Sequence, residues 1–193
     1  PGLLRASSPA LERRLRGLAL VRDRFVSEAE AAELLRELEP LLARRPYQFE
    51  HWDGAITGYR ETERELGGEV GQALLTRIAG AFPTGRPPQP LIHVLDLHQH
   101  GHIRPHIDSV KFCGCTIAGV SLLSPSVMRL QSCHSPRLWL ELLLPPGSLY
   151  ILRGAARYDF THEILPDEVS FFRGQRVPRG RRVALICRNA PQG

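Results

Sequence analysis

Two histidines and one aspartate have the spacing of a metal site. His106 and Asp108 are two positions apart. On an extended segment such residues project from the same face, so an imidazole and a carboxylate can bind one side of a metal ion. His162, at the end of a strand-like segment, can supply a third ligand. Two histidines and one carboxylate, with the other coordination positions open, are the ligand set of non-haem Fe(II) oxygenases. We therefore predict that these three residues bind metal and are catalytic.

Other interpretations of these residue types remain open. Histidines are dense before Asp108, where a solvated loop or an adventitious metal site would give the same pattern: His98, His100, His102 and His106. Thiols and one more histidine could in principle hold zinc: Cys113, Cys115, Cys133 and His134. This second group lacks the paired spacing of structural zinc sites, so we expect thiols on strands.

Two arginines bracket an apolar run near the end of the chain. Arg182 and Arg188 are six positions apart, an even number, so both guanidinium groups emerge on the same face of a strand. A planar guanidinium suits bidentate recognition of a dicarboxylic acid. The apolar residues between them would bury the strand, and a charge beside it then needs a partner. We predict a dicarboxylate site here; two exposed strand ends are the alternative.

Two helices are expected to support this site. Ser27 and Glu30 form a capping box at the start of a helical pattern over residues 27–45, with a break or kink near Glu39 because Pro40 follows. A second pattern covers residues 69–82. We expect both apolar stripes to pack on a sheet; binding of a partner is the alternative.

The remainder of the chain predicts short strands. A Pro-rich linker ends at residue 90, and strands are expected at 91–98, 116–123, 127–131, 137–143, 148–152, 156–160 and 182–187. The fold class is therefore α+β, with a sandwich or open barrel of the jelly-roll type as its core and N-terminal helices packed on one sheet. We divide the chain into an extension (1–26), a helical support region with a reduced lid (27–90) and the catalytic core (91–193). Residues 27–193 form one domain, and no apolar run is long enough to span a bilayer.

Over residues 91–189 the chain resembles the AlkB family of Fe(II)/2-oxoglutarate dioxygenases, and most of all a mitochondrial member. The resemblance rests on His106-x-Asp108, on Gly147 opening a strand, on Arg157-Tyr158-x-x-x-His162 and on Arg182-x5-Arg188. It implies a double-stranded β-helix, Fe(II) on the two histidines and the aspartate, and the oxoglutarate carboxylate on Arg182. It also implies O2 as cosubstrate, with oxoglutarate converted to succinate and CO2 as a C–H bond is oxidised.

One family element is different here. Members usually carry Asn-x-Tyr on the strand before His-x-Asp, where the tyrosine helps to bind oxoglutarate. With a one-residue deletion, these positions fall on Asp96 and His98. We therefore expect Tyr150, on the strand after Gly147, to replace the missing phenol.

The charges are informative about location. The net charge is +5, and 24 of the 25 basic residues are arginines, Lys111 being the exception. Most arginines are scattered among acidic residues, which is typical of a compositional bias. The first 24 residues carry six arginines against Glu12 and Asp23, as expected after an Arg-rich targeting region. We expect a mitochondrial protein of the matrix, and a monomer.

The substrate is the most open question. Enzymes that repair bases need a lid of hairpins over the iron, and residues 47–65 cannot make two of them. An open active site favours a substrate with its own shape, so we predict hydroxylation of a protein. Oxidative demethylation of RNA is the alternative, supported by the basic loop at 173–181. A catalytically idle iron-binding module is the third interpretation.

Overall fold

The computed structural model describes residues 2–50 and 54–192, and one long strand organises it. This strand, β4 (Ile92–His106), pairs along its first half with β3 (Ile56–Arg64) on one side and β12 (Arg182–Arg188) on the other. Near the end of β4, Ile103 and His106 pair with β9 (Phe160–Ile164), and β3 still pairs with His102 and Ile103. Register shifts interrupt both the β3 and the β9 ladders, and such irregularities bend a strand. β4 therefore joins two half-sheets.

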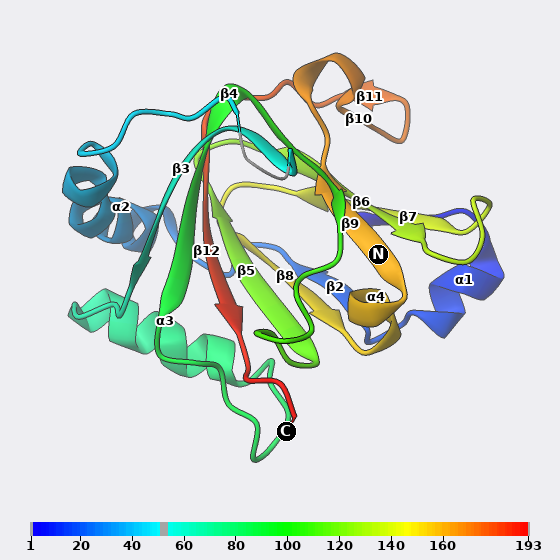
Figure 1. Ribbon diagram of the computed structural model, residues 1–193, viewed down its shortest axis with the longest axis horizontal. Coiled ribbons are helices and arrows are strands. Elements are labelled where there is room, and N and C mark those ends of the chain that lie inside the picture. The colour runs from blue at the N-terminus through cyan, green and yellow to red at the C-terminus, as the bar shows by residue number, and fades with distance from the viewer. Residues whose placement is uncertain (1, 51–53, 193) are drawn as a thin grey trace.

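The strands on either side of β4 form a roll (Figure 1). The large half runs β3-β4-β12-β5-β8-β2, and the small half runs β9-β6-β7-β1. The remaining members are β1 (Leu4–Ala6), β2 (Ala19–Arg22), β5 (Thr116–Leu122), β6 (Ser126–Ser132), β7 (Trp139–Leu144) and β8 (Ser148–Arg153). A separate two-stranded hairpin consists of β10 (Phe171–Phe172) and β11 (Gln175–Arg176). The predicted jelly-roll core is confirmed.

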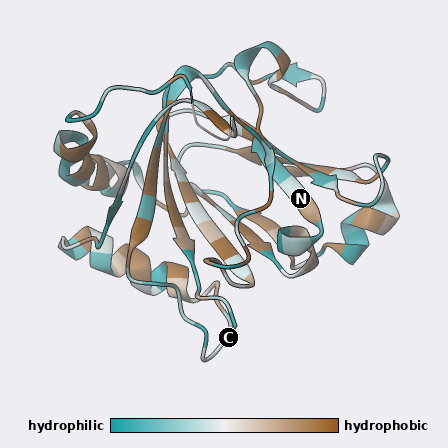
Figure 2. Ribbon diagram, in the orientation of Figure 1, coloured by the Kyte–Doolittle hydropathy of each residue, from teal (hydrophilic) through white to brown (hydrophobic). Residues whose placement is uncertain are grey.

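Two apolar clusters hold the layers together. Inside the roll, side chains of both half-sheets meet, among them Leu95, Tyr150, Leu130 and Phe160. On the other face of the large half, β4 contributes alternate residues such as Val94 to a second cluster with the helices. Figure 2 shows the apolar colour along the central strands and on the helices. The two-residue alternation along β4 thus buries both of its faces.

The helices lie where the sequence places them. α2 (Glu28–Leu42) and α3 (Glu69–Ala79) pack on the outer face of the large half-sheet. The capping box is present, because Ser27 Oγ accepts from the Glu30 amide at 3.1 Å and Glu30 accepts from the Ser27 amide at 3.0 Å. Packing of the helices on one sheet is therefore confirmed. No helix in the described part of the chain is long and apolar enough to cross a bilayer.

The helix does not break at Pro40. α2 continues to Leu42, and the Ala43 amide still donates to the Glu39 carbonyl at 2.9 Å. Pro40 removes the hydrogen bond to the Arg36 carbonyl, but only two helical residues follow it, so the interruption lies close to the end of the helix. Leu38 and Leu42 are fully buried on either side of it, so packing holds the turn in place.

The strand expected at 156–160 is wrong. The chain forms a helical turn, α4 (Ala155–Tyr158), before β9 begins at Phe160. Gly154 starts this turn with a φ of +51°, which disfavours residues with a side chain. As a result His162 lies in the middle of β9, whose residues alternate between buried and half-buried.

Residues near the N-terminus, expected to form an extension, pair with both ends of the sheet. β1 pairs with β7 and β2 pairs with β8, and α1 (Pro9–Arg14) lies between them. The region at 47–65, expected to be a reduced lid, contributes β3 and a bridge from Gln48 to Tyr59. Its residues 51–53 lie outside the described part.

Candidate metal centre

The bend of β4 brings the three predicted ligands together. His106 and His162 are directly opposite each other in the β4–β9 ladder, and their ring centroids are 4.3 Å apart. Asp108 Oδ1 lies 3.2 Å from His106 Nε2 and 3.5 Å from His162 Nε2. The candidate ligand atoms all lie within 4.8 Å of one another. Within residues 2–50 and 54–192, no other group of three such side chains comes this close.

Hydrogen bonding leaves the right atoms for a metal. His106 Nδ1 lies 2.9 Å from the Arg104 carbonyl oxygen, to which only a protonated nitrogen can donate. With Nδ1 engaged by this carbonyl, Nε2 of His106 is the nitrogen that a metal ion would use, and a carbonyl partner of this kind orients histidine ligands in metalloproteins. His162 Nδ1 is buried and has no hydrogen-bond partner among the described residues. Two nitrogen donors and one carboxylate oxygen fit Fe(II).

The surroundings of Asp108 and His162 favour the metal-binding protonation states of these two ligands. Burial alone would raise the pKa of the Asp108 carboxyl, but the hydrogen bond from His106 and the charge of Arg188 lower it far below the usual range. Arg188 Nε donates to Asp108 Oδ2 at 2.6 Å. Burial, together with the neighbouring His106, lowers the pKa of His162 to about 3. At neutral pH the site thus holds a carboxylate and a neutral imidazole of His162.

Stability of the metal-free protein should fall with acid because of His162. Its pKa is 6.5 without perturbation and about 3 in the fold. Below pH 6.5 the unfolded chain therefore binds a proton that the folded protein does not, and stability decreases towards pH 3, by roughly 5 kcal/mol at most. Urea denaturation of chelator-treated protein at several pH values measures this loss. In His162→Gln the decrease should be clearly shallower; equal slopes would contradict the assignment.

A buried arginine fixes the loop that carries Asp108. Arg157 is fully buried, and its guanidinium donates to the carbonyl oxygens of Asp108, Cys113 and Gly114 at 3.0, 3.1 and 2.9 Å. One side chain therefore holds both ends of the loop through its backbone. The Asp108 carboxylate takes no part in these contacts and stays available to the histidines and Arg188.

Arg157→Lys should loosen this loop. An ammonium group cannot reach three divergent carbonyls, so at least one buried carbonyl loses its donor, at a cost of about 2–4 kcal/mol. We expect a lower melting temperature and weaker Fe(II) binding, measured by thermal denaturation and metal titration. Arg137→Lys, at an exposed arginine whose side chain has no such contacts in the described structure, is the control and should change neither.

A recess beside the metal ligands contains Arg182 and Tyr150. Arg182 is 1% exposed, and its Nε donates to Ser121 Oγ at 2.8 Å. Its Nη2 is buried without a partner among the described residues, and burial lowers the pKa of this guanidinium. Burial also raises the pKa of Tyr150, so its phenol is neutral. A buried cation that lacks an anion is suited to a carboxylate ligand.

Of the three candidates for the family tyrosine, Tyr150 is the one that lines the recess. Asp96 is fully buried on the other face of β4, where it accepts hydrogen bonds from Tyr47, Arg60 and Arg181. His98 lies on that side as well, with its ring centroid 5.0 Å from that of Tyr47. Asp96 thus connects β4 to β3 and to the segments that carry Tyr47 and Arg181, and it does not line the recess.

Arg188 continues into a polar chain that sequence reasoning missed. Its Nη1 lies 3.3 Å from His93 Nδ1, and His93 Nε2 lies 2.9 Å from Glu61 Oε2. Arg188 was expected to bind oxoglutarate, but in the structure its nearest carboxylate is Asp108. The register of β3 on β4 creates the pair between Glu61 and His93, and no local pattern in the sequence indicates it.

The basic loop at 173–181 is largely engaged with the protein itself. Arg179 is 7% exposed and donates to the carbonyls of Gly101 and Leu165. The other three arginines also have partners: Arg173 donates to the Leu4 carbonyl, Arg176 pairs with Asp167, and Arg181 pairs with Asp96 and Glu39. Few of these guanidinium groups remain for phosphates.

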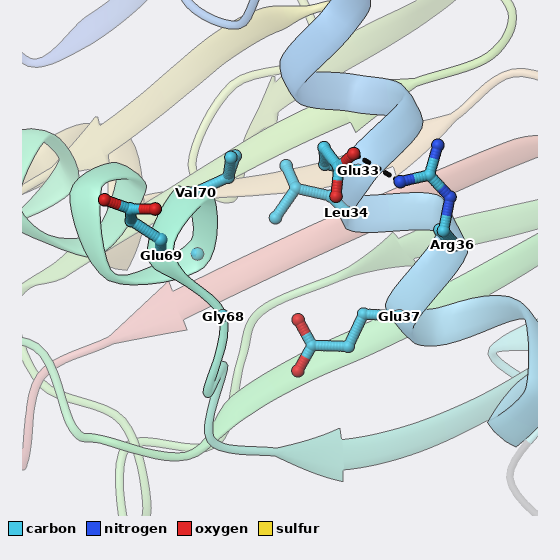
Figure 3. Close-up of a pocket in the computed structure, with 8 residues that line it drawn as sticks. Glu33, Leu34, Arg36, Glu37, Gly68, Glu69 and Val70 are labelled. Carbon is cyan, nitrogen blue, oxygen red and sulfur yellow. Dashed lines mark hydrogen bonds and ion pairs between the residues drawn. The ribbon is translucent and has the colours of Figure 1, made fainter.

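Two other candidate sites in the described part of the chain lack a set of residues that could bind a metal ion. The four cysteines are free thiols, and they form no metal-binding group with His134 within the described residues. A larger hollow lies between α2 and the start of α3 (Figure 3), near Glu33, Glu37 and Glu69. Glu33 pairs with Arg36, and Glu37 accepts from the side chain of Arg64. This hollow has no histidine or thiol in its lining.

Comparison with known proteins gives close relatives. The chain is 58% identical over 193 residues to the bovine (Bos taurus) "Alpha-ketoglutarate-dependent dioxygenase alkB homolog 7, mitochondrial", covering 100% of this chain and 87% of that protein. The mouse (Mus musculus) protein of the same name is 56% identical over 98% of this chain and 86% of its own. A prolyl-4-hydroxylase from Pseudomonas putida shares the fold, with a TM-score of 0.67, 14% identity and coverage of 95% and 98%. No protein-family model matches.

Proposed function

This chain belongs to the family of the mitochondrial alkB homolog 7 proteins, which are alpha-ketoglutarate (2-oxoglutarate)-dependent dioxygenases, and we propose that the chain hydroxylates a protein substrate. His106, Asp108 and His162 would hold the Fe(II) of this family, and Arg182 and Tyr150 would bind oxoglutarate. When bound, the iron supplies oxidation of a C–H bond by O2, coupled to decarboxylation of oxoglutarate. The expectations of an AlkB-like enzyme and of a mitochondrial protein are confirmed; a place in the matrix stays a prediction.

One observation carries the assignment of the site. The same recess is lined by two of the three ligand side chains, His106 and His162, and by Arg182, whose buried Nη2 has no partner in the described structure. A metal ion and a dicarboxylate would therefore meet in one place. Arg188, through its contact with Asp108, is better placed to orient a metal ligand than to bind the distal carboxylate. The complete set of ligands does not support a catalytically idle module.

The geometry favours a protein over RNA as substrate. The His106 side chain is 30% exposed, so the metal centre can be reached from the surface. The loop that suggested RNA binding uses its arginines within the protein, and a phosphate-binding surface needs them free. Demethylation of RNA remains the alternative, and the experiment below separates the two. We expect the enzyme to act as a monomer.

A substrate trap tests the proposal. His106→Ala protein is expressed in mitochondria, and the proteins and RNA that copurify with it are identified and then treated with wild-type enzyme. We expect a copurifying protein to gain the mass of one oxygen atom, dependent on Fe(II) and oxoglutarate. Demethylation of a trapped RNA, with no modified protein, would contradict the proposal. A parallel reaction without oxoglutarate is the control, and it shows any oxidation of the trapped protein that does not depend on the enzyme's cosubstrate.

Tyr150→Phe tests the replacement for the missing family tyrosine. Loss of a hydrogen bond to a carboxylate should raise the KM for oxoglutarate about tenfold and leave Fe(II) affinity unchanged. Tyr47→Phe is the matched control, because its hydroxyl donates to Asp96 at 2.9 Å on the opposite face of β4. An unchanged KM in Tyr150→Phe would mean that another residue contacts oxoglutarate.

A further inference from the structure

A surface groove adjoins the recess that contains the metal ligands. It consists of two hollows that share Glu63, His93 and Arg188. His93 and Arg188 also line the recess itself. A molecule that lies in this groove is therefore in contact with the walls of the metal centre.

One wall of the groove is apolar and exposed. Phe112 is 73% exposed and Leu91 is 51% exposed, and both line the same hollow. Phe112 belongs to the loop that Arg157 holds through three carbonyls, so this exposed side chain is carried by a backbone that hydrogen bonds fix in place. Large apolar side chains held in the open beside a reactive centre indicate a surface that binds a partner.

The other wall is acidic. Glu63 is exposed and, among the described residues, makes no ion pair. Glu61 lies next to it in the lining and contacts His93. Arg188 lines both hollows, but its guanidinium is paired with Asp108, and Arg45 brings a positive charge only to the hollow that lacks Phe112. In a chain with a net charge of +5, an acidic residue opposite an apolar wall selects for a cationic group.

We propose that this groove binds an extended segment of the substrate protein, with an apolar side chain between Leu91 and Phe112 and a lysine or arginine beside Glu63. The inference rests on the proposed protein substrate and gives its chemistry. The aromatic side chain provides the anchor, and the carboxylate sets the register of the segment relative to the metal. The residue to be oxidised then lies a few positions away along the segment, over His93 and Arg188.

A charge reversal at Glu63 tests the groove directly. A random nonapeptide display library is selected on the enzyme loaded with Fe(II) and oxoglutarate in the absence of O2. Wild-type protein should enrich peptides that combine an apolar residue with lysine or arginine. Glu63→Lys should reverse the preference to aspartate or glutamate, and Phe112→Ser should reduce enrichment by about tenfold or more. Phe171→Ser is the control, because Phe171 is 45% exposed on the separate β10–β11 hairpin.

The outcomes distinguish this inference from the proposed function. If Glu63→Lys keeps the wild-type charge preference, or if Phe112→Ser behaves like Phe171→Ser, the groove proposal is wrong. Hydroxylation of the trapped protein at wild-type rates by both groove variants would reject the groove and leave the protein substrate in place. Selection of no peptide, together with demethylation of a trapped RNA, would reject both. Unchanged melting temperatures and Fe(II) affinities confirm that the variants fold.

Discussion

Succinate formation from oxoglutarate should be lost in His106→Ala. The substitution removes the Nε2 donor that faces Asp108 and leaves two ligand side chains for the metal. Loss of about 4 kcal/mol of metal-binding free energy corresponds to roughly a 10³-fold weaker affinity. We therefore expect turnover to fall by at least this factor at limiting Fe(II), in an assay of succinate from oxoglutarate and O2.

The control for His106→Ala comes from the same strand. His100 belongs to the same run of histidines in β4 and is exposed, with its imidazole near Gln99 and His98. His100→Ala should keep wild-type Fe(II) affinity and succinate formation. If both variants lose activity equally, the histidine-dense segment binds metal collectively and the three-ligand site is wrong.

Arg182→Met should abolish productive binding of oxoglutarate while the fold persists. In the described structure the guanidinium has one hydrogen bond, to Ser121, and its Nη2 has no partner, so methionine removes a buried charge that lacks a counter-ion. Without this group the carboxylate loses a charge-assisted pair, and the dissociation constant for oxoglutarate should rise about 100-fold or more. Oxoglutarate should raise the melting temperature of the wild type and leave that of the variant unchanged.

Arg182→Lys gives the matched comparison. Lysine keeps the charge but has no planar fork, so it should restore part of the affinity for oxoglutarate. The Fe(II) affinity of both variants should equal that of the wild type, because Arg182 contacts none of the three ligands in the described structure. Undiminished oxoglutarate binding in Arg182→Met would show that the carboxylate lies elsewhere.

Local geometry made part of the site predictable. His106 is the last residue of β4 and Asp108 follows it by two positions, and this spacing alone indicates that the two side chains lie close together. The same parity predicts that Arg182 and Arg188 lie on one side of β12, where both line the recess. The capping box at Ser27 is likewise a local pattern. These features depend on residues a few positions apart, which is why sequence reasoning could find them.

Features that depend on distant contacts could not be found in this way. α4 exists because Gly154 turns the chain and Arg157 reaches three carbonyls of another loop. The pair between Glu61 and His93 depends on the register of two strands. The arginines of the basic loop looked free in the sequence, and only the fold shows their partners.

The contacts of Arg157 also have a thermodynamic consequence for metal uptake. Because a cation already holds the loop through backbone carbonyls, the loop does not have to become ordered when a metal ion arrives. The conformational entropy of this loop is already lost when the protein folds, so its ordering does not weaken the binding of the metal ion. The site is thus preorganised, and the protein separates the stability of its scaffold from the occupancy of its metal centre.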